Sequence, residues 1–358
     1  MVFIGGPRQV GKTTLALSLL KNPSKQNPAY LNWDVLEHKQ TIRKAEIPAE
    51  QDLIILDEIH KFKRWRGLVK GLFDQYHPNK NFIVTGSARL DYYRKGGDSL
   101  LGRYHYWRLH PFSVSELGSS DSIHDLLQYG GFPEPFLKAD KRFSRRWNRE
   151  RLNRIINEDL RDLENVQDLS LIELLVDALP DRVGSQLSLN SLSEDLDVSP
   201  RTVDRWVSIL ERLYLCFRIA PFGSPKIRAV KKTNKLYLWD WSIIEESGIR
   251  FENLVASHLL KFCHYTEDRE GHKMELRYIR DTDSREIDFV VLKNRQPLFA
   301  VECKLNERKL SKHINYFQER TKIPKFYQVH LSDTDFGDPE KGGRLMPFSK
   351  FAQELNLP

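Results

Sequence analysis

Short apolar runs alternate with amphipathic segments through the first 110 residues of the chain. Apolar runs bounded by polar residues are typical of buried strands, whereas apolar positions three and four apart are typical of helices. Strands are predicted at residues 2–4, 29–32, 53–56, 82–85 and 104–109, and helices at 13–20, 35–43 and 65–76. Because the two kinds of element alternate, we expect an α/β fold with a parallel sheet flanked by helices.

A helix-turn-helix pattern follows at residues 187–213. Ser199 and Pro200 are typical of the start of its second helix. That helix has an apolar stripe at helical spacing, formed by Val203, Trp206, Val207, Leu210 and Leu213. Its opposite face carries Arg201, Asp204, Arg205, Ser208 and Arg212. The pattern predicts a winged-helix middle domain, with a wing at the basic run Lys226, Arg228, Lys231, Lys232 and Lys235.

Two interpretations of this middle region stay open. The second helix can read DNA in a major groove, or the small domain can serve as a lid or adaptor; Asp204 and Glu211 weigh against contact with phosphate. An earlier predicted helix is equally ambiguous, because its arginines form either a nucleic-acid track or a solvated or inter-domain face. They are Arg142, Arg145, Arg146, Arg149, Arg151 and Arg154.

The last 120 or so residues again show mixed periodicity. Strands are predicted at 236–240, 276–279, 287–292, 298–303 and 327–331, with a helix at 249–263 and a loop at 333–343 before a short amphipathic tail. Asn294 and Arg295 indicate a turn between two of the strands. We therefore expect an α/β C-terminal domain.

A glycine-rich loop lies between the first strand and the first helix. Its residues are Gly6, Pro7, Arg8, Gln9, Val10, Gly11, Lys12 and Thr13, which match the phosphate-binding pattern GxxxxGK[ST], and Thr14 follows. The glycines let backbone N–H groups turn toward phosphate oxygens. Lys12 is expected to reach the terminal phosphates, and the Thr13 hydroxyl to bind Mg²⁺. The pattern predicts a P-loop nucleotide-binding domain.

Two carboxylates end the buried strand at 53–56. Ligands bind at the carboxyl ends of strands in open α/β sheets. Asp57 is expected to hold the same Mg²⁺ as Thr13, and Glu58 to orient or deprotonate an attacking water. Thr85 or Ser87, after the next strand, either contacts the γ-phosphate or the water, or caps the strand. Arg103 is a candidate arginine finger for a neighbouring subunit, or an ordinary surface arginine.

Acidic and basic residues in the C-terminal half form a second constellation. A hairpin of the strands at 287–292 and 298–303 would bring Asp288 beside Glu302, where two carboxylates can hold Mg²⁺. Lys304, on the same face as Glu302, would position or activate a water. This arrangement resembles the PD-(D/E)xK nuclease core, in which Glu252 would match the acidic residue of the first helix. An inactive nuclease-like fold and an exposed salt-bridge pair are the alternatives.

Composition narrows the class of protein only a little. The chain has 358 residues and a formal charge of +7, which permits a nucleic-acid partner or simply a basic surface. The cysteines, Cys216, Cys263 and Cys303, are far apart, which argues against a zinc site or a disulfide framework. Since no stretch approaches 18 apolar residues and Met1 opens directly into the first strand, we expect a cytoplasmic protein without a membrane partner.

Several motifs in combination resemble a prokaryotic family of AAA-type ATPases with a C-terminal domain of largely unknown function. They are GPRQVGKTT (6–14), LDEIHK (56–61), VTGSA (84–88), GR (102–103), HPFSVSEL (110–117), GGFPE (130–134), FENL (251–254), EIDF (286–289) and VECK (301–304). The resemblance implies ATP as the nucleotide.

The sequence thus predicts three domains: an AAA-type ATPase domain with a helical extension at 1–175, a winged helix at 176–235 and a nuclease-like domain at 236–358. The expected function is Mg-dependent ATP hydrolysis coupled to a C-terminal domain that contacts DNA, with homo-oligomerisation possible in principle. The alternative is a nucleotide-gated module that binds nucleic acid or protein without cutting it.

Overall fold

The computed structural model spans residues 1–358 and describes residues 1–86, 100, 102–118, 122–160, 168–223, 233–306 and 309–358. The chain divides into two compact units. Unit 1 comprises residues 1–110 with 212–214, and unit 2 comprises residues 111–211 with 215–358. The division into three domains at 175 and 235 stays a prediction, and its second boundary falls within strand β7 (Lys235–Leu238).

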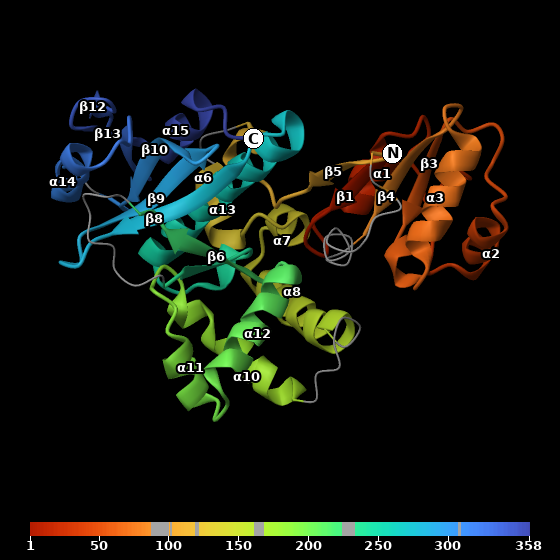
Figure 1. Cartoon of the computed structure of the whole chain (residues 1–358), viewed down its shortest axis with the longest axis horizontal. Helices are drawn as coiled ribbons and strands as arrows, with labels where there is room; N and C mark the ends of the chain where they lie inside the picture. The colour runs from red at the N-terminus through yellow and green to blue at the C-terminus, as the bar shows by residue number, and fades with distance from the viewer. Residues whose placement is uncertain (87–99, 101, 119–121, 161–167, 224–232, 307–308) are drawn as a thin grey trace. The chain divides into compact units, whose positions relative to one another are not determined.

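A parallel sheet forms the centre of unit 1 (Figure 1). In the described part of the unit, its strands follow the order β2-β3-β4-β1-β5 and every pairing is parallel. They are β1 (Val2–Gly5), β2 (Tyr30–Asn32), β3 (Leu53–Asp57), β4 (Asn81–Thr85) and β5 (His105–Arg108). The predicted α/β fold with a parallel sheet is therefore confirmed, and the strand ends agree to within one residue at most positions.

Helices flank this sheet as the apolar pattern predicts. They are α1 (Lys12–Ser18), α2 (Leu36–Lys44) and α3 (Trp65–Tyr76). Ile54 and Leu56 of β3 are fully buried, and they share one core with Ala16 of α1 and Val69 of α3. Because all strands are parallel, the residues that follow β1, β3 and β4 meet at one edge of the sheet.

Unit 2 begins with a series of helices. They are α5 (Val114–Leu117), α6 (Ser122–Tyr129), α7 (Pro133–Lys138), α8 (Lys141–Arg154), α10 (Leu169–Ala178), α11 (Leu189–Asp195) and α12 (Pro200–Arg212). The two predicted helices at 187–213 are present as α11 and α12. The predicted wing residues Lys226, Arg228, Lys231 and Lys232 lie outside the described residues.

Two details of the helical part differ from expectation. Arg151 of the arginine-rich α8 is 3% exposed, and one of its guanidinium nitrogens lies 3.9 Å from a carboxylate oxygen of Asp240. It therefore belongs to the interior and not to a charged outer face. Asp204 and Glu211 of α12 both accept hydrogen bonds from Arg218, at 2.5 and 2.7 Å. Their charge is thus partly neutralised within the domain.

A mixed sheet makes up the rest of unit 2 (Figure 1), with the described order β12-β13-β11-β10-β9-β8-β6-β7. Besides β7, its strands are β6 (Cys216–Pro221), β8 (Met274–Arg280), β9 (Glu286–Lys293), β10 (Gln296–Cys303), β11 (Phe326–His330), β12 (Phe336–Asp338) and β13 (Gly343–Pro347). The short strand β12 lies inside the predicted loop at 333–343, so that part of the prediction is wrong.

Long helix α13 (Ser247–Glu270) packs across β7, β8, β9 and β10. Its Phe251 and Leu254 are fully buried. Helix α14 (Lys312–Arg320) places Ile314 and Phe317 in a core with the apolar residues of β9, and α15 (Phe348–Glu354) closes the chain. The strands that carry Asp288 and Glu302 are therefore held between packed elements.

Candidate functional site

The predicted phosphate-binding loop joins β1 to α1 in a conformation that needs its glycines. Gly6 and Gly11 have φ angles of +138° and +100°. A Cβ atom at Gly6 would lie 2.3 Å from the carbonyl oxygen of Leu109. A side chain at this position is therefore excluded both by the backbone conformation and by the neighbouring strand end.

Lys12 extends back over the loop that precedes it. Its Nζ donates to the carbonyl oxygens of Gly6 and Pro7, at 3.0 and 2.5 Å, and the residue is 7% exposed. Of the other predicted loop residues, Val10 is buried, Arg8 and Gln9 are partly buried, and Thr14 is exposed in the first turn of α1. The backbone carbonyl groups of the loop thus hold the ammonium group of Lys12 in place.

Asp57, the last residue of β3, is 3% exposed and accepts hydrogen bonds from hydroxyl groups. Its Oδ2 accepts from Thr13 Oγ1 at 2.9 Å and from the hydroxyl of Tyr30 at 2.7 Å. Its Oδ1 accepts from Thr85 Oγ1. The structure therefore brings Thr13 and Asp57 into contact, although 44 positions separate them in the chain.

Glu58 lies beside Asp57 but points to a more open environment. The residue has φ of +56°, and its N–H donates to the carbonyl oxygen of Thr85 at 3.1 Å. Its side chain is 27% exposed, with Oε2 3.5 Å from Lys61 Nζ. Burial raises the pKa of Glu58, and the positive charge of Lys61 opposes that change. The carboxylate of Glu58 is thus partly exposed and paired with a lysine.

Tyr30 is a residue that sequence reasoning missed. It lies in the short strand β2 and looks like an ordinary core aromatic. Burial, followed by its hydrogen bond to Asp57, raises the pKa of Tyr30, so the hydroxyl stays a donor. Only the pairing of β2 with β3, where Tyr30 lies opposite Ile55, shows how it reaches Asp57.

Three further residues of the first 110 were predicted to act at this site, and the structure describes two of them. Thr85 is fully buried behind Asp57 and binds that carboxylate. Ser87 lies outside the described residues. Arg103 donates from Nε to Asp74 Oδ1 at 2.9 Å, within the same unit. A role of Arg103 toward another subunit remains a prediction.

The predicted C-terminal constellation is brought together by the hairpin of β9 and β10. The two strands are antiparallel, with Phe289 opposite Val301, and the N–H of Cys303 donates to Asp288 Oδ2 at 2.7 Å. Glu302 is 3% exposed, and its Oε1 lies 3.1 Å from Lys304 Nζ. Sequence periodicity therefore correctly places these side chains in one region.

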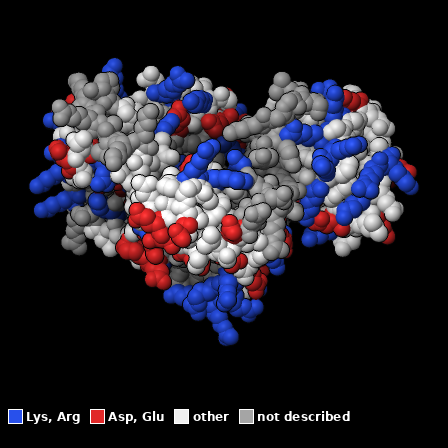
Figure 2. Space-filling model, turned by 60° about the horizontal axis from the view of Figure 1, so that its bottom comes forward, with Lys and Arg blue, Asp and Glu red and all other residues white. Residues whose placement is uncertain are grey.

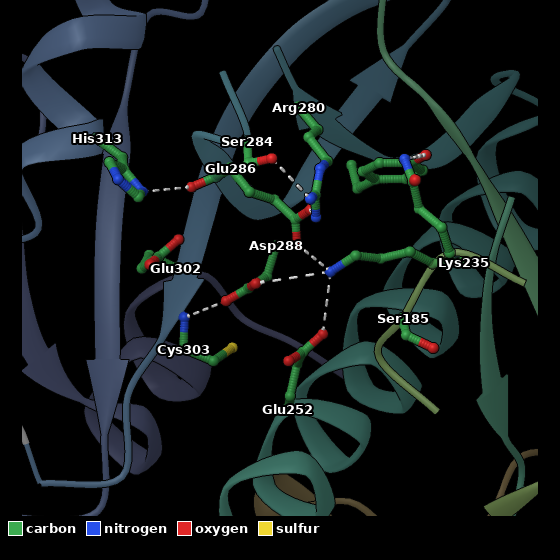
Figure 3. A network of polar contacts seen from close by, with 12 residues as sticks. Ser185, Lys235, Glu252, Arg280, Ser284, Glu286, Asp288, Glu302, Cys303 and His313 are labelled. Atoms are coloured by element: carbon green, nitrogen blue, oxygen red, sulfur yellow. Dashed lines mark hydrogen bonds and ion pairs between the residues drawn. The ribbon is translucent and has the colours of Figure 1, made fainter. Parts of the chain in front are cut away.

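Lys235 is the unexpected member of this region (Figure 3). It was predicted in a basic wing, but it is 1% exposed in β7. Its Nζ contacts Glu286 Oε1 and lies 3.4 Å from Glu252 Oε1 and 3.8 Å from Asp288 Oδ1. Lys235 is therefore not an exposed basic residue, and the carboxylates around it compensate the burial of its charge. The winged-helix assignment itself stays a prediction.

Four carboxylates lie close enough in this network to interact electrostatically. They are Glu252, Glu286, Asp288 and Glu302. Burial, followed by the charge of Asp288, raises the pKa of both Glu252 and Glu302. Burial also raises the pKa of Asp288 itself, against the opposing charge of Lys235. The region thus favours binding of a proton or a further cation.

The donor atoms of this region suit a metal ion only in part. Among the described residues, no three His, Cys, Asp or Glu side chains are arranged to share one metal ion. Asp288 and Glu302 alone provide the two carboxylates that Mg²⁺ accepts when water completes its shell. Glu302 Oε2 is buried and has no hydrogen-bond partner among the described residues, so the pair fits a cation bound mainly through water.

Comparisons with known proteins place these sites in context. Residues 1–118 match a family model described as an AAA domain. Two domains of unknown function, DUF8612 and DUF4143, match residues 120–249 and 247–351. The first match supports an AAA-type ATPase domain at the N-terminus, whereas the other two carry no stated activity.

The relatives are distant in sequence, and their names state no activity. Uncharacterized protein MJ1544 of Methanocaldococcus jannaschii is 22% identical and covers 94% of this chain and 82% of its own length. Uncharacterized protein Rv2008c of Mycobacterium tuberculosis is 23% identical over 68% of this chain and 55% of its own length. A variant of Thermotoga maritima RuvB aligns at 19% identity over 61% of this chain and 81% of that chain, with a TM-score of 0.29. A TM-score that low identifies no common fold.

None of the helices in the described ranges is long and apolar enough to cross a membrane.

Proposed function

We propose that this protein is a Mg-dependent ATPase of the AAA type, with its nucleotide site at the loop from Gly6 to Thr13. The observation that carries the proposal is the 2.9 Å hydrogen bond from Thr13 Oγ1 to Asp57 Oδ2. It joins the phosphate loop to the acidic end of a neighbouring strand, and these are the two positions that share a magnesium ion in P-loop ATPases.

The residues of this site form groups with different roles. The loop residues Gly6, Arg8, Gln9, Val10, Gly11 and Thr14 offer backbone N–H donors to the phosphates, and Pro7, which has no N–H, belongs to the same loop as a shaping residue. Lys12 exchanges its present carbonyl partners, Gly6 and Pro7, for terminal phosphate oxygens. Thr13 and Asp57 offer the hard oxygen donors that suit Mg²⁺, which when bound neutralises charge on the phosphates.

Glu58 is the proposed base that orients the attacking water, since it lies next to Asp57 with a partly exposed carboxylate. Its contact with Lys61 has to loosen for that role, because an ion-paired carboxylate is a poorer base. Arg103 is proposed as a finger toward a neighbouring subunit, which would require an oligomer and release of its bond to Asp74.

Two substitutions test the ATPase proposal. Lys12→Ala is expected to abolish ATP binding in titration calorimetry, and retained micromolar affinity would contradict the proposal. Glu58→Gln is expected to keep ATP binding and to lose about 10²-fold or more of turnover, as is usual for removal of a general base. Lys21→Ala, an exposed lysine just after α1, is the matched control and should change neither quantity.

For the C-terminal unit, we propose a nuclease-like domain that interacts with DNA. The support is the placement of Asp288, Glu302 and Lys304 on one hairpin, where the two carboxylates would hold Mg²⁺ and Lys304 would position a water. Positive charge suited to a DNA backbone is present on the protein surface, but on the face shown in Figure 2 it does not form one continuous patch. Lys and Arg side chains there form several separate groups, with a group of Asp and Glu among them.

A second candidate is a nucleotide-gated binding module with an inactive nuclease-like fold. The position of Lys235 favours it, because an ammonium group already neutralises the carboxylates on which a metal would depend. In that case ATP binding would change the protein's affinity for a nucleic acid or protein, and no strand would be cut.

DNA cleavage with Mg²⁺ or Mn²⁺ distinguishes the two candidates. Cleavage by the wild type that is lost in both Asp288→Ala and Lys304→Ala supports the nuclease. Salt-dependent DNA binding without cleavage in any of the three proteins supports the binding module. Cleavage that survives in both variants would assign the activity to a different site or to a contaminant.

A further inference from the structure

The buried ammonium of Lys235 lies between three carboxylates that come from two different elements (Figure 3). Glu252 comes from α13, whereas Glu286 and Asp288 lie two positions apart on β9. The contact with Glu286 is the shortest of the three, and those with Glu252 and Asp288 are 3.4 and 3.8 Å. The ammonium thus stands where several negative charges converge.

We propose that Lys235 is a built-in cation of this site, whose ammonium competes with a divalent metal ion for the carboxylates of Asp288 and Glu252. The inference rests on the proposed metal site of the C-terminal unit and adds to it a residue that limits metal binding. A divalent ion at Asp288 would lie close to the ammonium, and the two positive charges would repel each other at short range.

The backbone of Lys235 is fixed, so its side chain alone can vacate the site. Lys235 pairs with Ile219 of β6 on one side and forms a β-bridge with Gln186 on the other. Gly184, from the same loop as Gln186, lies against Glu252, where an added Cβ would be 3.2 Å from Oε1. The loop therefore closes over Glu252, and the side chain of Lys235 must change rotamer for a metal to replace its ammonium.

Glu302 provides independent support for the binding of a further cation. Its Oε2 is buried and has no hydrogen-bond partner among the described residues, although Lys304 binds the other oxygen, Oε1, at 3.1 Å. A buried carboxylate oxygen without a partner costs free energy unless a donor or cation reaches it. In the described part of the structure, Lys235 pairs with Glu252, Glu286 and Asp288 but not with Glu302. Lys235 thus neutralises Glu252, Glu286 and Asp288, whereas Glu302 stays open to a further cation.

Removal of the ammonium is the direct test. Lys235→Met keeps the length of the side chain and removes its charge. We expect the full-length variant, without nucleotide, to bind Mn²⁺ about tenfold more tightly or better than the wild type, as measured by electron paramagnetic resonance titration. Asp288→Asn in the Lys235→Met background should remove that gain, which would assign it to this site.

A matched control and a second variant make the test independent of folding. Lys261→Met removes another buried lysine of the same unit, one that is paired with Glu116, and should leave Mn²⁺ affinity unchanged. Should Lys235→Met fold poorly, Lys235→Met with Glu286→Gln removes a negative charge as well. Circular dichroism verifies the fold of each protein.

The outcomes separate this inference from the proposed function. Mn²⁺ binding by the wild type that is unchanged or weaker in both Lys235 variants would overturn the competing role and leave the metal site standing. No Mn²⁺ binding in the wild type or in either variant would overturn both the competing role and the metal-dependent nuclease. Neither result bears on the ATPase site of unit 1.

Discussion

Buried carboxylates occur in both units, but their surroundings differ. Asp57 in unit 1 accepts hydrogen bonds from the hydroxyl groups of Thr13, Tyr30 and Thr85. Asp288 in unit 2 lies near the ammonium of Lys235 instead. Neutral hydroxyls hold a carboxylate in place without cancelling its charge, whereas an ammonium cancels it. The first arrangement keeps a negative charge available for a metal, and the second already supplies a cation.

The largest expected effect concerns stability in unit 2. Lys235→Met should lower the free energy of unfolding by about 3–5 kcal/mol, because it leaves buried carboxylates without their counter-charge. Urea unfolding followed by tryptophan fluorescence measures this loss. Adding Glu286→Gln should recover part of it, since one negative charge is removed together with the positive one.

Lys261→Met is the control for that measurement. Lys261 is also buried, but its partner Glu116 has a side chain that is 42% exposed and can be hydrated when the lysine is lost. The control should therefore lose less stability. Equal losses in the two variants would contradict the view that Lys235 compensates a special concentration of charge.

A smaller effect should follow from pH, through His258 on α13, the helix that also carries Glu252. His258 Nδ1 is 2.8 Å from the carbonyl oxygen of Leu254, and Nε2 accepts from the N–H of Val114 at 3.1 Å. The neutral ring with a proton on Nδ1 satisfies both contacts. Burial lowers the pKa of His258 to about 4, and the hydrogen bond to the carbonyl oxygen of Leu254 only partly opposes that change.

The sign of the pH effect follows from that lowered pKa. In the unfolded chain, His258 takes up a proton near its ordinary pKa of 6.5, while the folded protein resists protonation until about pH 4. Stability is therefore fully present above pH 6.5 and falls by about 3 kcal/mol as pH drops to 4. Thermal unfolding at pH 7.5 and 5.0 measures the change. His258→Gln should be less stable at pH 7.5 but less sensitive to pH, and an unchanged pH sensitivity would exclude this histidine as the cause.

In both units, the sequence alone predicted the site residues that belong to continuous local motifs. The loop around Lys12 and Thr13, and the apolar strand that ends at Asp57, are continuous motifs whose geometry follows from neighbouring residues. The period of two along β9 and β10, with a turn between them, likewise placed Asp288 near Glu302. The parallel sheet of unit 1 was predicted for the same reason.

The remaining partners depend on contacts between distant segments. Tyr30 resembles a core aromatic, and Lys235 belongs to a run of basic residues that looks exposed. Arg151 was grouped with surface arginines on α8, yet it is buried near Asp240. A residue's charge does not show which distant carboxylate will compensate it. Glu286 was within reach of sequence reasoning, because it lies two positions before Asp288 and so shares its strand face.

The smallest expected effect tests the hydroxyl environment of Asp57. Tyr30→Phe removes one of three hydroxyl donors and also leaves Asn32 Nδ2 without the acceptor that it contacts at 2.9 Å. The free energy of unfolding should fall by about 1–2 kcal/mol, because a hydrogen bond to a charged group is lost. The affinity for ATP in the presence of Mg²⁺ should weaken less than tenfold, since Thr13 and Thr85 still orient the Asp57 carboxylate. Tyr76→Phe is the matched control, because the Tyr76 hydroxyl donates to the carbonyl oxygen of Ala45 at 2.7 Å and is not among the hydroxyl groups that bind Asp57 in the described structure. It should lose similar stability without changing the Mg²⁺ dependence of ATP binding. If Tyr30→Phe leaves both stability and Mg²⁺ dependence at wild-type values, hydroxyl groups do not position Asp57, and the contrast with the lysine-filled site of unit 2 loses its physical basis.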